Sequence, residues 1–243
     1  MKHDFRSGYE LLVRKRVRQH GPQKGAERSV GDEFHGMGQL QLLLLQHYGL
    51  RPDESVVEVG CGAGRLAVHL ARYLKGTYRG FDVVPYLVRH AQRITRNDRF
   101  SFAVADGWTI PLAEGTTDRV CAFSVLTHLL PEHGFRYLRE MRRVLRPGGQ
   151  GVVSFLDIEI PQTWPLFEQS CQDLEKNTPL NTFLSRSHLL VWLNRLNLEA
   201  LDFMNGDAGV IGAGEHIILD DGRQQTGPFA LGQSVCVFRK PVE

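Results

Sequence analysis

Three glycines and an aspartate in the first half of the chain have the types and the spacing needed to hold a nucleotide. Gly60, Gly62 and Gly64 follow the apolar run 56–59, and without side chains they let a tight turn bring backbone amides close to a ligand. Asp82 follows about 20 positions later, where an acidic side chain can accept hydrogen bonds from both hydroxyls of a ribose. The spacing predicts a nucleotide-binding turn. Its alternatives are a turn that binds no ligand and Asp82 as the N-cap of the helix that follows it.

A second aspartate ends the next strand-like run. Asp106 is followed by Gly107 and Trp108, so its carboxylate could accept a hydrogen bond from an exocyclic amine while the indole flanks a flat base. The alternative for Trp108 is packing in the core. The fingerprint of dinucleotide-binding folds has a glycine where this chain has Arg65, so the pattern differs from that of nicotinamide-binding proteins.

A histidine just after the fourth predicted strand could move a proton at the same place. An imidazole at His128 is suited to act as general base for a hydroxyl or amine, and the alternative is a structural histidine. No metal site is expected. The four cysteines form no C-x-x-C pair and mostly lie in apolar stretches, as small core residues do; they are Cys61, Cys121, Cys171 and Cys236. They fit a reducing compartment, so the protein is expected to be cytoplasmic.

Strand-like and helix-like segments alternate through the region that carries these residues. Strands are expected over 56–59, 77–82, 100–105, 118–125 and 151–156. Helices are expected after the glycine turn, over 85–97 and over 131–146. This alternation predicts an α/β fold, a doubly wound and mostly parallel sheet with helices on both faces.

The composition argues against two classes of protein. A net charge of +2 and a pI near 8.4 are too mild for the strongly basic face of a nucleic-acid-binding protein, so no such partner is expected. No apolar run reaches the roughly 18 residues that a membrane span needs. With 243 residues, 42% of them hydrophobic, the chain is long enough for one large core.

The order of the motifs resembles the class I, Rossmann-like, S-adenosylmethionine-dependent methyltransferases. Over 55–155 the resemblance is carried by V-V-E-V-G-C-G-A-G-R, F-D, A-D-G-W, D-R-V-C-A-F-S-V-L-T-H-L and L-R-P-G-G-Q-G-V-V-S-F. It implies S-adenosyl-L-methionine as cofactor, with the methionine part in the glycine turn, the ribose on Asp82 and the adenine amine on Asp106. Glu58 would help to order the first loop. The remaining residues of the implied cofactor site are Cys61, Val83, Gly107, Trp108 and Ser124.

The family fold also implies the arrangement of the rest of the chain. A seven-stranded sheet would be completed by a sixth strand over 198–203 and an antiparallel last strand over 234–238. Residues 1–38 are expected to form an N-terminal arm, either amphipathic or loose, with a basic cluster of unknown role. A single methyltransferase domain would span 39–243, with a helical cap insertion over 157–197 between strands five and six.

The expected acceptor is a small molecule with an oxygen or nitrogen nucleophile. Enzymes of this fold that methylate base amines or glutamine amides carry an N-P-P-Y-like motif after the fourth strand, where this chain has S-V-L-T. Cytosine C5 enzymes need a Pro-Cys pair, which Cys121 lacks. The acceptor itself and the oligomeric state stay open. Two other functions remain as alternatives: a non-catalytic regulatory or assembly protein that binds the cofactor, and a nicotinamide-dependent oxidoreductase.

Overall fold

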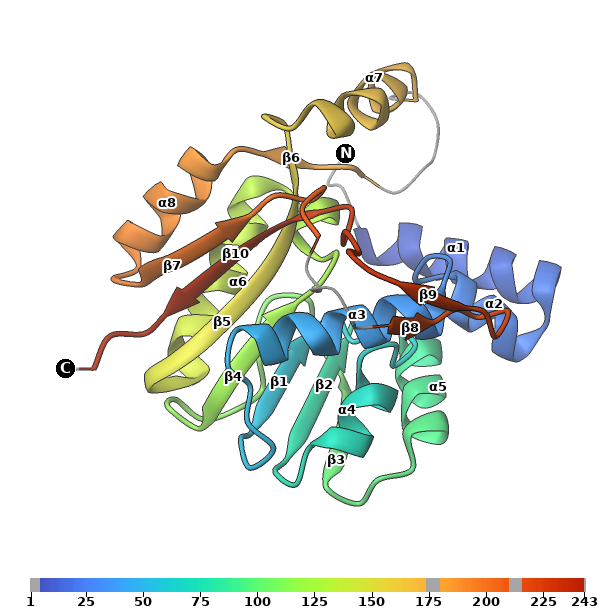
Figure 1. The fold of residues 1–243 in the computed structure, drawn as a ribbon, viewed down its shortest axis with the longest axis horizontal. Helices are drawn as coiled ribbons and strands as arrows, with labels where there is room; N and C mark the ends of the chain where they lie inside the picture. The colour runs from blue at the N-terminus through green and yellow to red at the C-terminus, as the bar shows by residue number, and fades with distance from the viewer. Residues whose placement is uncertain (1–4, 174–179, 210–215, 243) are drawn as a thin grey trace.

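A mixed β-sheet runs through the computed structural model, which describes residues 5–173, 180–209 and 216–242 (Figure 1). The strands on its main path lie in the order β3-β2-β1-β4-β5-β10-β7. They are β1 (Val56–Val59), β2 (Tyr78–Asp82), β3 (Phe100–Val104), β4 (Thr117–Ala122), β5 (Leu145–Asp157), β7 (Glu199–Met204) and β10 (Ser234–Arg239). Only β10 runs antiparallel to its neighbours, β5 and β7. The predicted fold class, with its antiparallel last strand, is confirmed.

Helices cover both faces of this sheet (Figure 1). The helices are α1 (Phe5–His20), α2 (Pro22–Arg28), α3 (Phe34–His47), α4 (Ala67–Tyr73), α5 (Pro85–Thr95), α6 (Pro131–Val144), α7 (Trp164–Gln172) and α8 (Arg186–Arg195). One core cluster joins α3 and α4 to the sheet, and another joins α6 and α8 to the opposite face. None of the described helices is long and apolar enough to cross a membrane.

Several predicted boundaries differ from the structure for local reasons. The connection between β3 and β4 contains no helix, so the predicted alternation is interrupted there. The predicted fourth strand ends early, at Ala122, because Ser124 adopts a left-handed conformation with φ 58° before the short 3-10 turn η1 (Leu126–His128). The helix predicted over 131–146 ends two residues early, at Val144, because the chain passes directly into β5 at Leu145.

Two short strand pairings occur besides those of the predicted sheet. The two-residue β6 (Phe183–Leu184) pairs in parallel with the end of β5. The hairpin of β8 (His216–Ile218) and β9 (Gln224–Thr226) forms a separate antiparallel pair that lies beside α3 (Figure 1). The predicted cap over 157–197 comprises the turn η2 (Pro161–Thr163), α7, β6 and α8, while its residues 174–179 lie outside the described part of the chain.

The predicted N-terminal arm consists of two packed helices where the structure describes it. α1 and α2 contact each other, and α2 contacts α5 (Figure 1). Val13, Ala26 and Phe34 are buried with Leu87 of α5 in a third core cluster. The arm therefore has a core of its own against the domain, and the boundary predicted at residue 38 falls inside α3.

Helix α3 is held at both ends by residues far away in the sequence. At its start, the carboxylate of Asp220 accepts hydrogen bonds from the amides of Phe34 and His35, at 2.8 and 2.7 Å. Near its end, Arg119 donates to the carbonyls of Tyr48 and Gly49 at 3.0 and 2.6 Å. Between these ends, Gly38 lies so close to α4 that an added Cβ would be 2.2 Å from the carbonyl oxygen of Arg65. The position of α3 is thus closely defined.

Candidate active site

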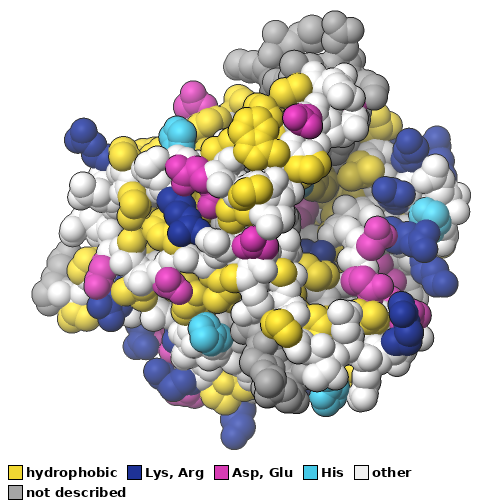
Figure 2. Space-filling view, turned by 45° about the horizontal axis from the view of Figure 1, so that its top comes forward, with side chains coloured by type: hydrophobic (Ala, Val, Ile, Leu, Met, Phe, Trp, Pro, Cys, Tyr) yellow, Lys and Arg dark blue, Asp and Glu magenta, His cyan; other side chains and the backbone are white. Residues whose placement is uncertain are grey.

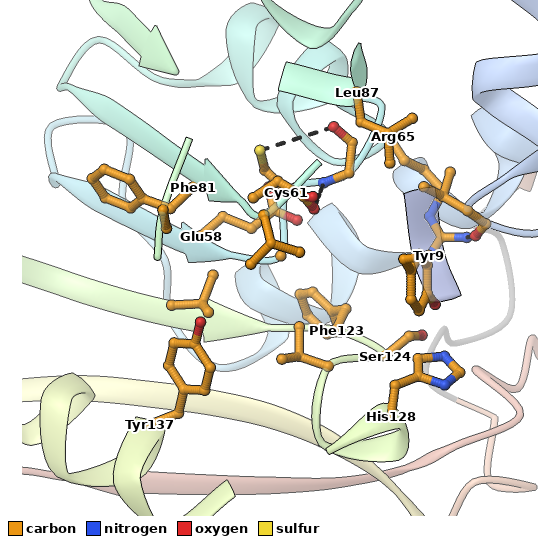
Figure 3. Close-up of a pocket in the computed structure, with 18 of the residues that line it drawn as sticks. Tyr9, Glu58, Cys61, Arg65, Phe81, Leu87, Phe123, Ser124, His128 and Tyr137 are labelled. Atoms are coloured by element: carbon orange, nitrogen blue, oxygen red, sulfur yellow. Dashed lines mark hydrogen bonds between the residues drawn. The ribbon is translucent and has the colours of Figure 1, made fainter. Parts of the chain in front are cut away.

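A cavity of about 320 Å³ lies at the carboxyl ends of the central strands (Figure 3). It brings together eight of the residues predicted from the sequence: Glu58, Gly60, Cys61, Gly62, Asp82, Val83, Ser124 and His128. Ligands of open parallel sheets bind at this edge, so the placement agrees with the general rule for the fold.

The glycine turn forms one wall of the cavity. Gly60 and Gly62 have φ values of 71° and 52°, which non-glycine residues rarely adopt. A Cβ on Gly60 would lie 2.3 Å from the side chain of Val125, and one on Gly62 would lie 2.6 Å from that of Val30. The turn is therefore a close-fitting backbone cradle, as a bound nucleotide requires.

The Asp82 carboxylate is fixed by the same turn. One oxygen accepts the amide of Gly62 at 2.9 Å, and the other accepts the amide of Val84 at 2.8 Å. Burial raises the pKa of this carboxyl group and outweighs the opposing effect of the amides. Each oxygen keeps further acceptor capacity, which suits the two hydroxyls of a ribose. Val84 itself is the N-cap residue of α5, and no side chain caps this helix, so Asp82 is not its N-cap.

Glu58 lies beneath the turn at the end of β1. Its side chain is only 4% exposed and accepts a hydrogen bond from the hydroxyl of Tyr78. Burial raises its pKa to about 7, while the Tyr78 hydrogen bond opposes that change. This carboxyl group therefore titrates at a higher pH than an exposed glutamate does.

His128 enters the cavity from the side opposite the turn (Figure 3). Its Nδ1 lies 2.7 Å from the carbonyl oxygen of Leu180, and because a carbonyl only accepts, Nδ1 carries the proton in this contact. Burial lowers the pKa of the ring, so it is neutral at neutral pH and its Nε2 is a proton acceptor. This is the protonation state that a general base needs.

Tyr9 of α1 lies over His128 in the cavity (Figure 3). The two rings meet edge to face, with centroids 5.2 Å apart. Burial raises the pKa of the Tyr9 hydroxyl above its usual range, so the hydroxyl stays protonated. Sequence reasoning missed Tyr9, because a single tyrosine in a polar helix carries no signal of its partner.

Arg65, noticed in the sequence only as a departure from another fingerprint, also lines the cavity. Its guanidinium donates to the carbonyl of Val30 at 2.7 Å and so joins the glycine turn to the segment before α3. Other lining residues that the sequence did not single out are Gln41, Thr109, Phe123, Tyr137 and Gln233.

Four predicted residues do not line the cavity: Gly64, Asp106, Gly107 and Trp108. Gly64 packs against α5, where an added Cβ would be 3.0 Å from Ala91. Asp106 is exposed and accepts hydrogen bonds from the amides of Trp108 and Thr109. Desolvation raises the pKa of its carboxyl group, but these hydrogen bonds together have the larger effect and lower it. The Trp108 ring meets that of His133, with centroids 4.3 Å apart. The predicted roles of Asp106 and Trp108 toward an adenine therefore stay predictions.

A second cavity, also of about 320 Å³, adjoins the first. The two share a wall made by Val30, Gly31, Gln41, Arg65, Phe123, Ser124 and Gln233. Met37, Ser154 and Leu231 belong to the second cavity alone. A ligand in the first cavity would thus have a neighbouring space for a second molecule.

The surface view shows how the molecule is hollowed on this side. Hydrophobic side chains gather near the top of the view in Figure 2, where α7 carries the exposed Trp164 and Leu166. Charged side chains gather on the right, over α1 and α2, and the surface is hollowed between the two groups. An apolar rim and a charged rim therefore face each other.

Comparisons with known proteins agree with this geometry. The methyltransferase domain family matches residues 56–149. The chain is 30% identical to methyltransferase GfsG of Streptomyces halstedii over 196 residues, which cover 67% of this chain and 68% of that protein. It is 28% identical over 158 residues to norajmaline N-methyltransferase of Rauvolfia serpentina, covering 61% of this chain and 53% of that relative, about half its length.

The fold is also similar to solved methyltransferase structures. Magnesium protoporphyrin IX methyltransferase from Synechocystis PCC 6803, solved with bound S-adenosylhomocysteine, matches with a TM-score of 0.66 and 15% identity, covering 99% of this chain and all of that one (100%). The sequence relatives decide against the nicotinamide-dependent and non-catalytic alternatives. The chain belongs to the class I S-adenosylmethionine-dependent methyltransferases, and its cofactor is S-adenosyl-L-methionine.

Proposed function

We propose that this enzyme methylates an oxygen or nitrogen nucleophile of a small-molecule acceptor. The observation that carries the proposal is a neutral imidazole, that of His128, in the same cavity as the glycine turn and Asp82. Nδ1 is anchored on the Leu180 carbonyl, which leaves Nε2 to take a proton from an acceptor hydroxyl or amine.

The cofactor-binding roles follow the contacts of each residue. Gly60, Cys61 and Gly62 would hold the methionine part against the backbone, and Asp82 would accept the ribose hydroxyls, with Val83 beside it. Glu58 would support the turn from below, and Ser124 would face the reacting end. Asp106, Gly107 and Trp108 are proposed to meet the adenine only at the edge of the cavity, beside the lining residue Thr109.

The bound cofactor supplies an activated methyl group together with its own leaving group. The protein has to align the acceptor, exclude water and remove a proton. Tyr9, whose ring meets that of His128 edge to face, would shield the imidazole from solvent. His128 would then accept the proton at Nε2 as the acceptor atom is methylated.

A small-molecule acceptor is favoured over a macromolecule by the size of the site and by charge. The space beside the cofactor cavity measures about 320 Å³, and the net charge of +2 provides little attraction for a polyanion. One of the two relatives named above is an N-methyltransferase of the small molecule norajmaline. The four free cysteines fit a reducing compartment, and we place the enzyme in the cytoplasm.

Labelled methyl transfer into a cell extract, followed by mass identification of the product, tests the proposal. We expect label in the small-molecule fraction. In His128→Gln, turnover should fall by about 100-fold with unchanged S-adenosylhomocysteine affinity, as expected for loss of a general base. His47→Gln, the same change at the exposed end of α3, is the matched control. Label found only in protein or nucleic acid would refute the acceptor class, and normal turnover of the His128 variant would refute the base.

A further inference from the structure

The wall shared by the two cavities contains a buried glutamine, Gln41. It lies in α3, is 2% exposed, and lines both cavities. Its amide has no hydrogen-bond partner among the described residues, whereas Gln39 on the same helix bonds to His216 and Ile218 of the hairpin. The amide atoms are accessible from the cavities, so a ligand there can donate to Oε1 and accept from Nε2.

A second set of polar groups faces the same shared wall. The Ser124 amide donates to Ser154 Oγ at 2.8 Å, and Ser154 Oγ donates to Gln233 Oε1 at 2.7 Å. Gln233 Nε2 donates in turn to Ser124 Oγ at 2.9 Å. This closed chain fixes Gln233 and leaves the hydroxyl proton of Ser124 for a ligand. The wall therefore offers an amide that donates and accepts, beside a hydroxyl that donates.

The charges around the second cavity are of both signs. Arg65, Asp32 and Glu33 lie on the same lining, so a ligand charge of either sign would meet repulsion as well as attraction. The remaining lining is apolar, from side chains such as Met37 and Leu231. An uncharged polar group on an apolar skeleton meets each of these conditions.

We propose that Gln41 and Ser124 bind an uncharged hydroxyl group on an apolar skeleton, which is a recognition element of the methyl acceptor. A hydroxyl both donates and accepts, so it can donate to the Gln41 Oε1 and accept a hydrogen bond from the Ser124 hydroxyl. Because both residues lie on the wall shared by the two cavities, this binding places the acceptor beside the cofactor. The inference rests on the proposed function, since it takes the second cavity as the acceptor site.

The experiment compares three small probes of one shape on the protein saturated with S-adenosylhomocysteine. Cyclohexanol, cyclohexylamine and cyclohexanecarboxylate are titrated by ligand-observed NMR at pH 7.5. We expect cyclohexanol to bind most tightly and Gln41→Met to weaken it about five-fold, as for loss of one ordinary hydrogen bond. Gln46→Met, the same change on α3 outside both cavities, should leave the affinity unchanged.

A second readout separates ligand recognition from a structural role. Without ligand, Gln41→Met should leave the midpoint of thermal unfolding within about 2 °C, because the amide reaches the cavities and bonds to no other part of the described structure. A midpoint lowered by more than this or a variant that fails to fold would overturn the inference, since the amide would then support the fold. Absent cyclohexanol binding, tighter binding of a charged probe, or unchanged affinity in Gln41→Met would overturn it as well.

Calorimetry of S-adenosylhomocysteine with the unsubstituted protein distinguishes the two levels of failure. If this ligand does not bind, the proposed function fails. If it binds normally while cyclohexanol shows none of the expected behaviour, only the assignment of Gln41 and Ser124 fails.

Discussion

Replacing Glu58 by glutamine should stabilise the protein at alkaline pH. The carboxyl group is 4% exposed, and burial raises its pKa from 4.5 to about 7. Because folding raises this pKa, the contribution of Glu58 to stability is complete below about pH 4.5 and is lost as the pH rises through 7. At about 1.4 kcal/mol for each pH unit, the loss is about 3 kcal/mol.

Glutamine has the shape of the protonated carboxyl group and cannot ionise. Its carbonyl can still accept the Tyr78 hydroxyl, so the packing beneath the glycine turn is kept. The free energy of unfolding of Glu58→Gln should therefore exceed that of the unsubstituted protein by about 1 kcal/mol at pH 5 and about 3 kcal/mol at pH 8.5.

Urea unfolding of both proteins between pH 5 and pH 8.5 measures this difference directly. Glu168→Gln makes the same chemical change at an exposed position of α7 and should follow the unsubstituted protein throughout. A difference that stays constant with pH, or that shrinks as the pH rises, would refute the reasoning about the buried carboxyl group.

Three further substitutions test other parts of the structure. Asp82→Ala should weaken S-adenosylhomocysteine binding by about 1.5 to 3 kcal/mol in calorimetry, through loss of hydrogen bonds to a charged acceptor, and unchanged affinity would remove it from the ribose site. Arg119→Met should cost about 3 to 5 kcal/mol in urea unfolding, because buried Glu54 loses its 2.8 Å ion pair with Arg119 and keeps only that with the exposed Arg51. A loss below about 1 kcal/mol would contradict this. Gly38→Ala should lower stability by about 1 to 3 kcal/mol, since its Cβ would overlap the carbonyl of Arg65, and an unchanged thermal midpoint would show that α3 can shift.

The parts of the fold that local patterns describe were predictable. A β-branched run before glycines specifies β1 and the turn, and apolar spacing specifies α5 and α6. The antiparallel direction of β10 was predicted only from the resemblance to a family, because strand direction depends on contacts between distant segments. The carboxyl end of α6 was predicted two residues too late, at 146, for a similar reason, since the chain continues directly from Val144 into β5.

The residues of the candidate site also divide into those that local sequence patterns predict and those that they do not. Glu58, the glycines and Asp82 follow from strand ends close together in the sequence. Tyr9, Gln41 and Gln233 come from other segments, and each is an ordinary polar residue within its own segment. They meet only because α1, α3 and the segment before β10 come together around the cavity, so no local pattern could have identified them.

The cap on α3 has a consequence for the order in which the protein matures during synthesis. Asp220, which closes the amino end of this helix, is 186 positions away from Phe34. At ordinary translation rates those residues take on the order of 10 to 40 seconds to be made. Until then α3 lacks its cap and the hairpin beside it, so the wall that carries Gln41 is among the last parts of the molecule to assume its final shape. A ribosome-bound chain that stops before the hairpin should therefore contain the glycine turn but lack a finished acceptor cavity.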